Sequence, residues 1–200
     1  MSIKWILFDA DWVVINSEMF SVKYQKMSGV KNEDMLPFFL WEFINTIEWK
    51  ADLMEIITPR LPKWKWDKPV IEFLKYWFIS EHKTDKKVID SINKLKSNWI
   101  KCFLATNQEQ YRTSYMKNEM WFEKLFDFVF SSCELWYKKP EDNFYLKILD
   151  TLENNHWINK EEILFFDDSK KNVNKANELW IKSYLYTNYE EYEKIINKLN

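Results

Sequence analysis

This sequence has almost no glycine. Glycine accounts for 1 of its 200 residues, against a usual frequency of about 7%, whereas tryptophan accounts for 12. Cysteine is also scarce: Cys102 and Cys133 are in no CxxC spacing, and Cys102 lies in the apolar run IKCFLAT, where a buried free thiol is the simplest interpretation. The few cysteines favour a reducing cytoplasm, whereas the missing glycines require a separate explanation.

Long apolar runs and an excess of charge of either sign are missing as well. No uncharged stretch approaches the length of a membrane span, and MSIKWILFDAD has aspartates where a signal peptide needs small residues, so neither a membrane nor export is expected. The 29 basic and 31 acidic residues give a net charge of −2 without a basic patch, which argues against nucleic acid as a partner. With 46% hydrophobic residues, the composition predicts a cytoplasmic globular protein with one substantial core, or a core and a small added domain.

Five short apolar runs bounded by polar residues predict strands that are buried on both faces. They are WILFDA (5–10), IKCFLAT (100–106), FDFVF (126–130), EILFFD (162–167) and IKSYLY (181–186). Segments with helical spacing separate the later runs, for example Val88, Ile92 and Leu95 before the second run. This alternation predicts an α/β fold with a mostly parallel sheet covered by helices, in which ligands bind beyond the carboxyl ends of the strands.

Residues 17–85 interrupt this alternation. Four segments there have helical spacing with no convincing strand between them, and Pro59, Pro62 and Pro69 mark expected helix boundaries. The segments are SEMFSVKYQKM (17–27), EDMLPFFLWEFINTI (33–47), KADLMEII (50–57) and DKPVIEFLKYWFISEH (67–82). We therefore expect an all-helical cap at residues 17–85, inserted into a core formed by residues 1–16 and 86–200.

Acidic residues follow two of the predicted strands. Asp9 and Asp11 lie two positions apart at the end of the first strand, so their side chains point to the same side of an extended backbone. Two such carboxylates repel each other unless a cation or a shared proton compensates them. Asp167 and Asp168 form a second acidic pair at the end of the fourth strand. If these strands are neighbours, the carboxylates converge on a site of hard oxygen ligands that suits Mg²⁺.

Three further polar residues follow the second and third predicted strands, at the same edge of the predicted sheet. Thr106 and Asn107 close the second strand in LATN, and Lys139 follows the third strand in ELWYKKPE. Each signal taken alone is typical of a helix cap, a turn or a solvated loop. Together, a nucleophilic carboxylate, a second carboxyl group, a hydroxyl, an ammonium group and a metal indicate phosphoryl transfer.

These motifs resemble those of the haloacid dehalogenase (HAD) superfamily of hydrolases over nearly the whole chain. FDADWVV (8–14) is similar to the family's first motif DxDG(T/V), LATN (104–107) to its second, YKKPE (137–141) to its third and FFDDSKKNV (165–173) to its acidic fourth. The resemblance implies a Rossmann-like, three-layer α/β/α core with a helical cap inserted after the first motif, which is where the helical block lies.

The resemblance also implies a role for each matching residue. Asp9 would attack phosphorus to give an aspartyl-phosphate, and Asp11 would protonate the leaving alcohol and then activate water. Thr106 would hold the phosphoryl oxygens together with Asn107, and Lys139 would neutralise charge near Asp9.

The same resemblance implies a Mg²⁺ site. Asp168 would bind the ion together with the side chain of Asp9 and the backbone carbonyl of Asp11, and Asp167 would lie behind these ligands. Many relatives carry another acid four residues after the metal aspartate, where this chain has Asn172. We therefore expect a somewhat altered metal affinity.

Asp11 separates subclasses of the family. The resemblance implies that dehalogenases lack an aspartate at this position, because no alcohol leaves in their reaction and no acid is needed to protonate it. Asp11 therefore favours phosphate chemistry. The leading prediction is a Mg²⁺-dependent phosphatase acting on a small phosphorylated metabolite. A sugar phosphomutase, which would use the same residues with a sugar as acceptor, stays open, as does the choice between monomer and homodimer.

Trp12 stands where the family has glycine. Glycine adopts positive φ without strain, whereas another residue there costs about 1–2 kcal/mol before its bulk is counted. Tryptophan recurs where helices end and a strand or loop begins, positions that glycine dominates. The glycine-like positions are Trp5, Trp12, Trp99, Trp121, Trp136, Trp157 and Trp180. One hypothesis is that the gene uses UGA as a glycine codon and that the written sequence was translated with a code that reads UGA as tryptophan.

Two other interpretations keep the tryptophans as written. Those of the cap, Trp41, Trp64, Trp66 and Trp77, fit ordinary packing residues. If Trp12 is genuine, the chain fits a catalytically impaired binding domain of the same fold, with the aromatic residues of LPKWKWDKP (61–69) facing a partner protein. A nucleic-acid binder that uses KWKWDK is disfavoured by the balanced charge around it.

Overall fold

The centre of the molecule is a parallel sheet. The computed structural model describes residues 3–156 and 160–198, and all neighbouring strands of its five-stranded sheet are parallel, in the order β3-β2-β1-β4-β5. The strands are β1 (Trp5–Phe8), β2 (Lys101–Thr106), β3 (Phe128–Ser131), β4 (Ile163–Asp167) and β5 (Lys182–Leu185). The predicted α/β class with a mostly parallel sheet is confirmed. β1, the strand that Asp9 directly follows, lies between β2 and β4, so the first and fourth predicted strands are neighbours.

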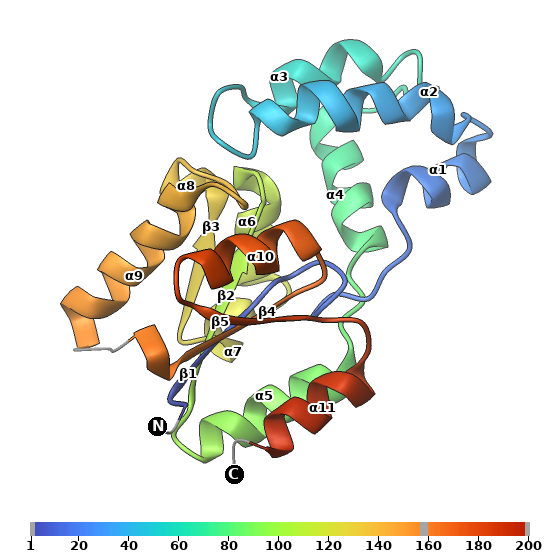
Figure 1. Cartoon of the computed structure of the whole chain (residues 1–200). Helices are drawn as coiled ribbons and strands as arrows, with labels where there is room; N and C mark the ends of the chain where they lie inside the picture. The colour runs from blue at the N-terminus through green and yellow to red at the C-terminus, as the bar shows by residue number, and fades with distance from the viewer. Residues whose placement is uncertain (1–2, 157–159, 199–200) are drawn as a thin grey trace.

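Two layers of helices cover the sheet (Figure 1). Ile6 and Phe8 of β1 point to the layer that contains α5 (Lys86–Ser97) and α11 (Tyr189–Asn197), whereas Trp5 and Leu7 point to the layer that contains α9 (Asp142–His156) and α10 (Lys170–Glu178). This alternation follows from the two-residue period of a strand, and both faces are apolar because both are buried. The helices of the core are α5 (Lys86–Ser97), α6 (Gln110–Asn118), α7 (Phe122–Leu125), α8 (Ser132–Leu135), α9 (Asp142–His156), η4 (Lys160–Glu162), α10 (Lys170–Glu178) and α11 (Tyr189–Asn197).

The segment between β1 and α5 forms a separate group of helices (Figure 1). It has its own buried cluster, rich in aromatic rings, in which Phe20, Tyr24 and Phe73 pack together. Its elements are α1 (Phe20–Ser28), α2 (Asn32–Pro37), η1 (Phe38–Glu42), η2 (Phe43–Asn45), α3 (Leu53–Ile57), η3 (Thr58–Arg60) and α4 (Val70–Ser80). We call these elements the cap; the domain limits at residues 16/17 and 85/86 stay a prediction. None of the helices within the described ranges is long and apolar enough to cross a membrane.

One predicted cap helix is interrupted. Residues 33–47 have continuous helical spacing, yet α2 ends at Pro37, and a π-helical turn and a 3₁₀ turn follow it. Proline lacks the backbone N–H, and its ring crowds the carbonyl one turn earlier, so the regular hydrogen-bond pattern is disturbed there. The hydrophobic spacing was therefore right about helical structure and wrong about a single helix.

Several tryptophans have a left-handed backbone conformation. Among the described residues, six tryptophans have φ between 58° and 66°, and we call them the left-handed tryptophans. They are Trp12, Trp49, Trp99, Trp121, Trp136 and Trp180. The sequence did not single out Trp49. Trp5, which it did single out, is buried in β1 and stacks on Phe103, and Trp157 lies outside the described residues.

Candidate functional site

A buried cluster of charged groups lies at the carboxyl ends of β1 and β4. Asp9 directly follows β1, and Asp167 is the last residue of β4. Lys139, from the loop between α8 and α9, places its ammonium group 2.8 Å from Asp9 Oδ1 and 2.7 Å from Asp167 Oδ2. The exposed fractions are 8% for Asp9, 4% for Lys139 and 0% for Asp167, so the three groups interact with little screening by water. The sequence predicted that Asp9 and Lys139 would meet, and the structure brings them together.

The charged groups of this cluster shift one another's pKa values. Burial raises the pKa of Asp9 well above its ordinary value; Lys139 opposes this effect and Asp167 adds to it. Burial would lower the pKa of Lys139, but the two carboxylates outweigh it, and the net pKa is raised. Lys139 also donates to the carbonyl of Ala105 at 2.8 Å, which fixes the direction of the ammonium group. The cluster has two carboxylates and one ammonium group, which leaves an unbalanced negative charge when both carboxylates are ionised.

Asp168 completes a group of carboxylates that could hold a cation. Oxygen atoms of Asp9, Asp167 and Asp168 all lie within 4.8 Å of one another. Asp167 accepts hydrogen bonds from the backbone N–H of Ser169 at 2.8 Å and from the side-chain amide of Asn172 at 2.9 Å, in addition to Lys139. Asp168 is exposed, and burial of part of its surface raises its pKa. Asn172 thus holds Asp167 in place, a role that the sequence did not indicate.

Asp11 lies outside this group of carboxylates. Its Oδ1 contacts the guanidinium group of Arg112 at 2.8 Å, and its Oδ2 accepts a hydrogen bond from the side-chain amide of Gln108. Arg112 also contacts Glu81, at 3.0 Å. Sequence reasoning missed Gln108, Arg112 and Glu81. The signal that could have found Arg112 is that it is one of 2 arginines in the chain and follows the LATN motif closely.

The segment after β2 positions the remaining predicted residues. Thr106 is buried at the end of β2, and the side chain of Asn107 pairs with the backbone of Lys139 in both directions, donating to its carbonyl at 2.9 Å and accepting from its N–H at 2.8 Å. Asn107 therefore holds the loop that carries Lys139. Glu109 caps the next helix, α6, by accepting from the N–H groups of Tyr111 and Arg112, and burial raises its pKa to about 7.

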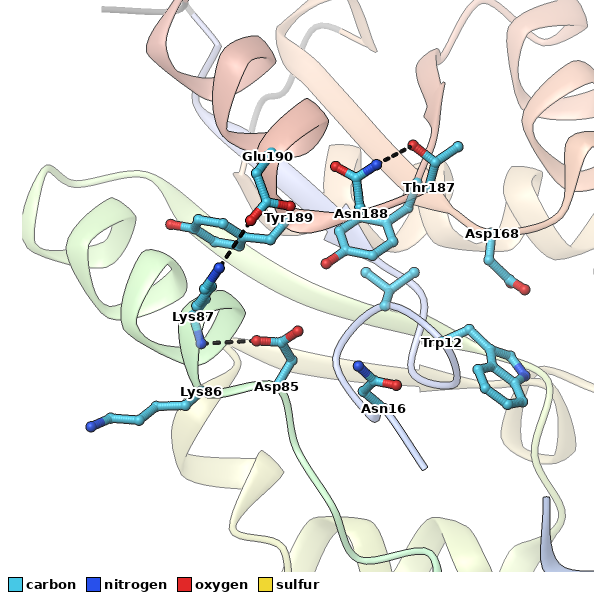
Figure 2. A pocket seen from close by; sticks show the side chains of 12 residues that line it. Trp12, Asn16, Asp85, Lys86, Lys87, Asp168, Thr187, Asn188, Tyr189 and Glu190 are labelled. Atoms are coloured by element: carbon cyan, nitrogen blue, oxygen red, sulfur yellow. Dashed lines mark hydrogen bonds and ion pairs between the residues drawn. The ribbon is translucent and has the colours of Figure 1, made fainter. Parts of the chain in front are cut away.

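Two pockets adjoin the candidate site, one beside Asp168 and one beside Asp11. One, of about 570 Å³, is lined by Asp168 and Trp12 together with residues that precede and begin α5 and α11, and Figure 2 shows Trp12 and Asp168 on the same side of it. The other, of about 110 Å³, is lined by Asp11, Trp12, Glu81 and Arg112 among others. Trp12 lines both pockets and is 47% exposed, so its indole lies beside the site without being packed into the core.

Comparisons with known proteins agree with this architecture. The family model described as haloacid dehalogenase-like hydrolase matches residues 6–186, and a search of curated proteins by sequence gives no match. Several solved structures are similar at low sequence identity. A predicted HAD-like family hydrolase from Porphyromonas gingivalis is 22% identical, with a TM-score of 0.75, over 100% of this chain and 98% of that one.

Two other similar structures differ in what they were crystallised with. A HAD family enzyme from Bacteroides thetaiotaomicron, in complex with magnesium and inorganic phosphate, is 20% identical with a TM-score of 0.72, over 92% of this chain and 94% of that one. The L-2-haloacid dehalogenase from Xanthobacter autotrophicus, with chloropropionic acid covalently bound, is 13% identical with a TM-score of 0.65, over 94% and 80%. At these identities the likeness shows a shared fold.

Proposed function

Because the chain belongs to the haloacid dehalogenase-like hydrolases, we propose that it is a Mg²⁺-dependent phosphatase that hydrolyses a small phosphomonoester through an aspartyl-phosphate. The observation that carries this proposal is the position of Asp9. Its carboxylate is buried beside the ammonium group of Lys139, and a second aspartate, Asp11, lies two residues away with its carboxylate held separately. One carboxylate is thus suited to attack and the other to proton transfer.

The reaction has two steps, formation and hydrolysis of the aspartyl-phosphate. In the first, a carboxylate oxygen of Asp9 forms a bond to phosphorus while the bond between phosphorus and the ester oxygen breaks, and Asp11 gives its proton to the leaving alkoxide. In the second, Asp11 takes a proton from water, which attacks phosphorus and releases Asp9 and inorganic phosphate. Lys139 offsets negative charge beside Asp9 in both steps, and the hydroxyl of Thr106 is suited to donate to a phosphoryl oxygen.

The carboxylates fit a hard divalent cation. Asp9, Asp167 and Asp168 supply only oxygen atoms, which Mg²⁺ prefers, and the single ammonium group of Lys139 does not balance the negative charge of the three carboxylates. We assign Asp9 and Asp168 as side-chain ligands, with the backbone carbonyl of Asp11, as the resemblance to the family implies. Asp167 is a poorer ligand because both of its oxygens already accept hydrogen bonds, from Ser169, Asn172 and Lys139. Bound Mg²⁺ would neutralise charge on the phosphoryl group. The complex of the similar Bacteroides thetaiotaomicron enzyme with magnesium and inorganic phosphate supports a Mg²⁺ site in this fold.

Asp11 also supports phosphate over halide chemistry. A halide leaves without a proton, so a dehalogenase has no use for an acid two residues after its nucleophile, whereas an alkoxide needs one. A sugar phosphomutase would use the same residues, with a sugar hydroxyl in place of water. The position of Trp12 at the pocket beside Asp11 favours a third possibility for the chain as written, a binding domain with impaired catalysis.

The experiment is a comparison of Asp9→Asn with the unchanged chain. We expect hydrolysis of p-nitrophenyl phosphate that requires Mg²⁺ and is abolished in Asp9→Asn at an unchanged melting temperature. Asp90→Asn, an exposed aspartate on α5, is the matched control and should keep full activity. A Trp12→Gly variant tests whether the indole obstructs the site. Activity that survives in Asp9→Asn would contradict the role of Asp9, and inactivity of both the unchanged chain and Trp12→Gly would favour the binding domain.

A further inference from the structure

Arg112 connects three parts of the molecule through one guanidinium group. It lies on α6 of the core with 8% of its surface exposed, and it contacts Asp11 at 2.8 Å and Glu81 at 3.0 Å. The other oxygen of Asp11 accepts from Gln108, which precedes the same helix. The carboxylate that we assign to proton transfer is therefore held by two donors from the segment that follows β2.

Glu81 lies where the cap joins the core. It follows α4, the last helix of the cap, and one of its oxygens accepts from the backbone N–H of Phe20, the first residue of α1, at 2.8 Å. Its other oxygen accepts from the indole N–H of Trp77 at 3.0 Å. Glu81 thus ties together both crossings of the chain between core and cap. Because the planar guanidinium group of Arg112 fixes the directions of the two carboxylates it binds, a rotation of the cap must strain or break its contact with Glu81.

We propose that Arg112 is a positioning residue that couples the position of the cap to the orientation of Asp11. The carboxylate of Asp11 is then correctly directed for proton transfer only in one position of the cap, which excludes water from the site at the same time. The proposal rests on the proposed function, because it gives Asp11 the role of acid and base. An ion pair that only stabilises the fold would have the same contacts but would not distinguish between leaving groups.

The test compares two aryl phosphates that differ in their need for an acid. The phenolate of phenyl phosphate leaves with help from a proton, whereas p-nitrophenolate leaves without one. Both substrates form the same aspartyl-phosphate, whose hydrolysis also uses Asp11, so the comparison is made in kcat/KM, which reports only the step in which the phenolate leaves. In Arg112→Met we expect kcat/KM for phenyl phosphate to fall about 100-fold, with a much smaller loss for p-nitrophenyl phosphate. Arg112→Lys should rescue part of the loss, since an ammonium group can contact one carboxylate but cannot bridge both. Glu81→Gln should show the same dependence on the leaving group.

Lys117→Met on the same helix is the matched control and should leave both substrates unaffected, because Lys117 pairs with Glu134 on the surface. An equal loss of kcat/KM for both substrates in Arg112→Met would overturn the coupling and leave the phosphatase intact. If the unchanged chain and its Trp12→Gly variant hydrolyse neither substrate, the proposed function itself fails. The two failures are therefore distinguishable.

A different observation, the left-handed tryptophans, carries a second inference. Three of them have the hydrogen bond of a helix that ends in a left-handed residue: the N–H after Trp49, Trp99 and Trp180 donates to the carbonyl five residues before it, at 2.9, 3.1 and 3.0 Å. The sole glycine of the chain, Gly29, has a φ of 71° at the end of α1, so it occupies the same kind of position. Lys65 is the other non-glycine residue with positive φ among those described.

Packing does not compensate for this backbone strain. The exposed fractions of the left-handed tryptophans run from 46% for Trp49 to 91% for Trp99, whereas Trp64 and Trp77, which have no positive φ, are each 3% exposed. Trp49 stacks on Trp136 with 6.1 Å between ring centres, but such a contact does not require left-handed backbone. Six bulky residues thus adopt the conformation that suits glycine best, with about half or more of each residue's surface exposed to water.

We infer that all six positions are glycine in the protein that the cell makes, and that their codons are UGA read as glycine. Independent mutation has no reason to place one rare residue type at six left-handed positions, whereas reassignment of a single codon does so at once. The inference includes Trp49, which lies outside the positions expected from the sequence. It leaves Trp5 and the tryptophans without positive φ undecided, because their backbone accepts any residue.

Two measurements test the inference. The gene should carry UGA at all six positions, and the protein isolated from its own cells should give peptides with the mass of glycine there; UGG codons at these positions would overturn it. In the purified chain, Trp99→Gly and Trp180→Gly should each raise the melting temperature by about 2–4 °C. Trp41→Gly is the matched control, since Trp41 is 73% exposed but lies in the helical turn η1, where glycine should lower the melting temperature. An equal loss in all three variants would also contradict the inference.

Discussion

The core and the cap bury different kinds of side chain. At the ends of β1 and β4 the core buries Asp9, Asp167 and the ammonium group of Lys139, a combination that is unfavourable unless the charges compensate one another. The hydrophobic cluster of the cap is built from aromatic and aliphatic side chains, for example Phe20 against Trp77. The difference teaches that the reactive groups belong to the core, whereas the cap contributes an apolar interior of its own. Charged contacts link the two, for example Arg112 with Glu81 and Lys138 with Glu48.

The tryptophans of the core and of the cap differ in the same way. Trp64 and Trp77 fill the interior of the cap, where their rings contact several other rings. Trp99 and Trp180 lie exposed at the ends of core helices with a φ of 65° and 66°. The same side chain therefore stabilises one region by burial and strains the other through its backbone.

Removal of the positive charge of Lys139 should have the largest effect on stability and activity. Lys139→Met leaves Asp9 and Asp167 buried without their cation, so we expect a loss of about 3–5 kcal/mol in the free energy of unfolding. It should also lower kcat by about 10²–10³-fold, because the charge beside the nucleophile is gone. Urea unfolding and steady-state kinetics would measure both effects.

Lys194→Met is the control for this change. Lys194 lies on α11 and pairs with Glu191 at 2.6 Å, with both side chains mostly exposed, so its loss should cost less than about 1 kcal/mol. Similar losses of stability in both variants would show that the buried cluster of the core is no more costly to disturb than a surface ion pair.

The next largest effect should come from the interior of the cap. Trp77→Ala removes a ring that lies 5.2 Å from the ring of Phe20 and 5.3 Å from that of Phe39, so we expect a loss of about 3–5 kcal/mol. Trp99→Ala removes a ring that is 91% exposed and should change stability by less than about 0.5 kcal/mol. Thermal unfolding of both variants would check the comparison, and a large loss in Trp99→Ala would show that its exposed ring does stabilise the core.

Much of the fold and part of the candidate site could be predicted from the sequence. Strands buried on both faces are apolar throughout, so their runs are visible, and parallel strands end at the same edge, so residues such as Asp9 and Asp168 are expected to meet. The convergence of Lys139 on Asp9 was predicted from the resemblance to the family. The left-handed positions at helix ends were visible because glycine is expected there, with the exception of Trp49 in the cap.

The remaining contacts depend on tertiary structure. Arg112 and Asp11 are separated by 101 positions, and no local pattern indicates that a helix face should meet a loop at that distance. The pairing of Asn107 with the backbone of Lys139 is hidden for the same reason, since an asparagine after a strand has many possible partners. In the cap, hydrophobic spacing could not show where Pro37 ends regular helix.

The smallest effect should be a dependence of stability on pH that comes from Glu109. Burial raises its folded-state pKa to about 7 from an ordinary value of 4.5, so between these pH values the folded chain holds a proton that the unfolded chain has lost. Stability therefore falls as the pH rises from 4.5 to 7, by up to about 3 kcal/mol. Glu109→Gln should remove this slope and gain stability relative to the unchanged chain at pH 8, where Glu109 is ionised. Glu119→Gln, an exposed glutamate just after the same helix, should keep the slope. Urea unfolding at pH 5 and pH 8 would decide, because an unchanged slope in Glu109→Gln means that the helix N-terminus holds Glu109 ionised in spite of its burial.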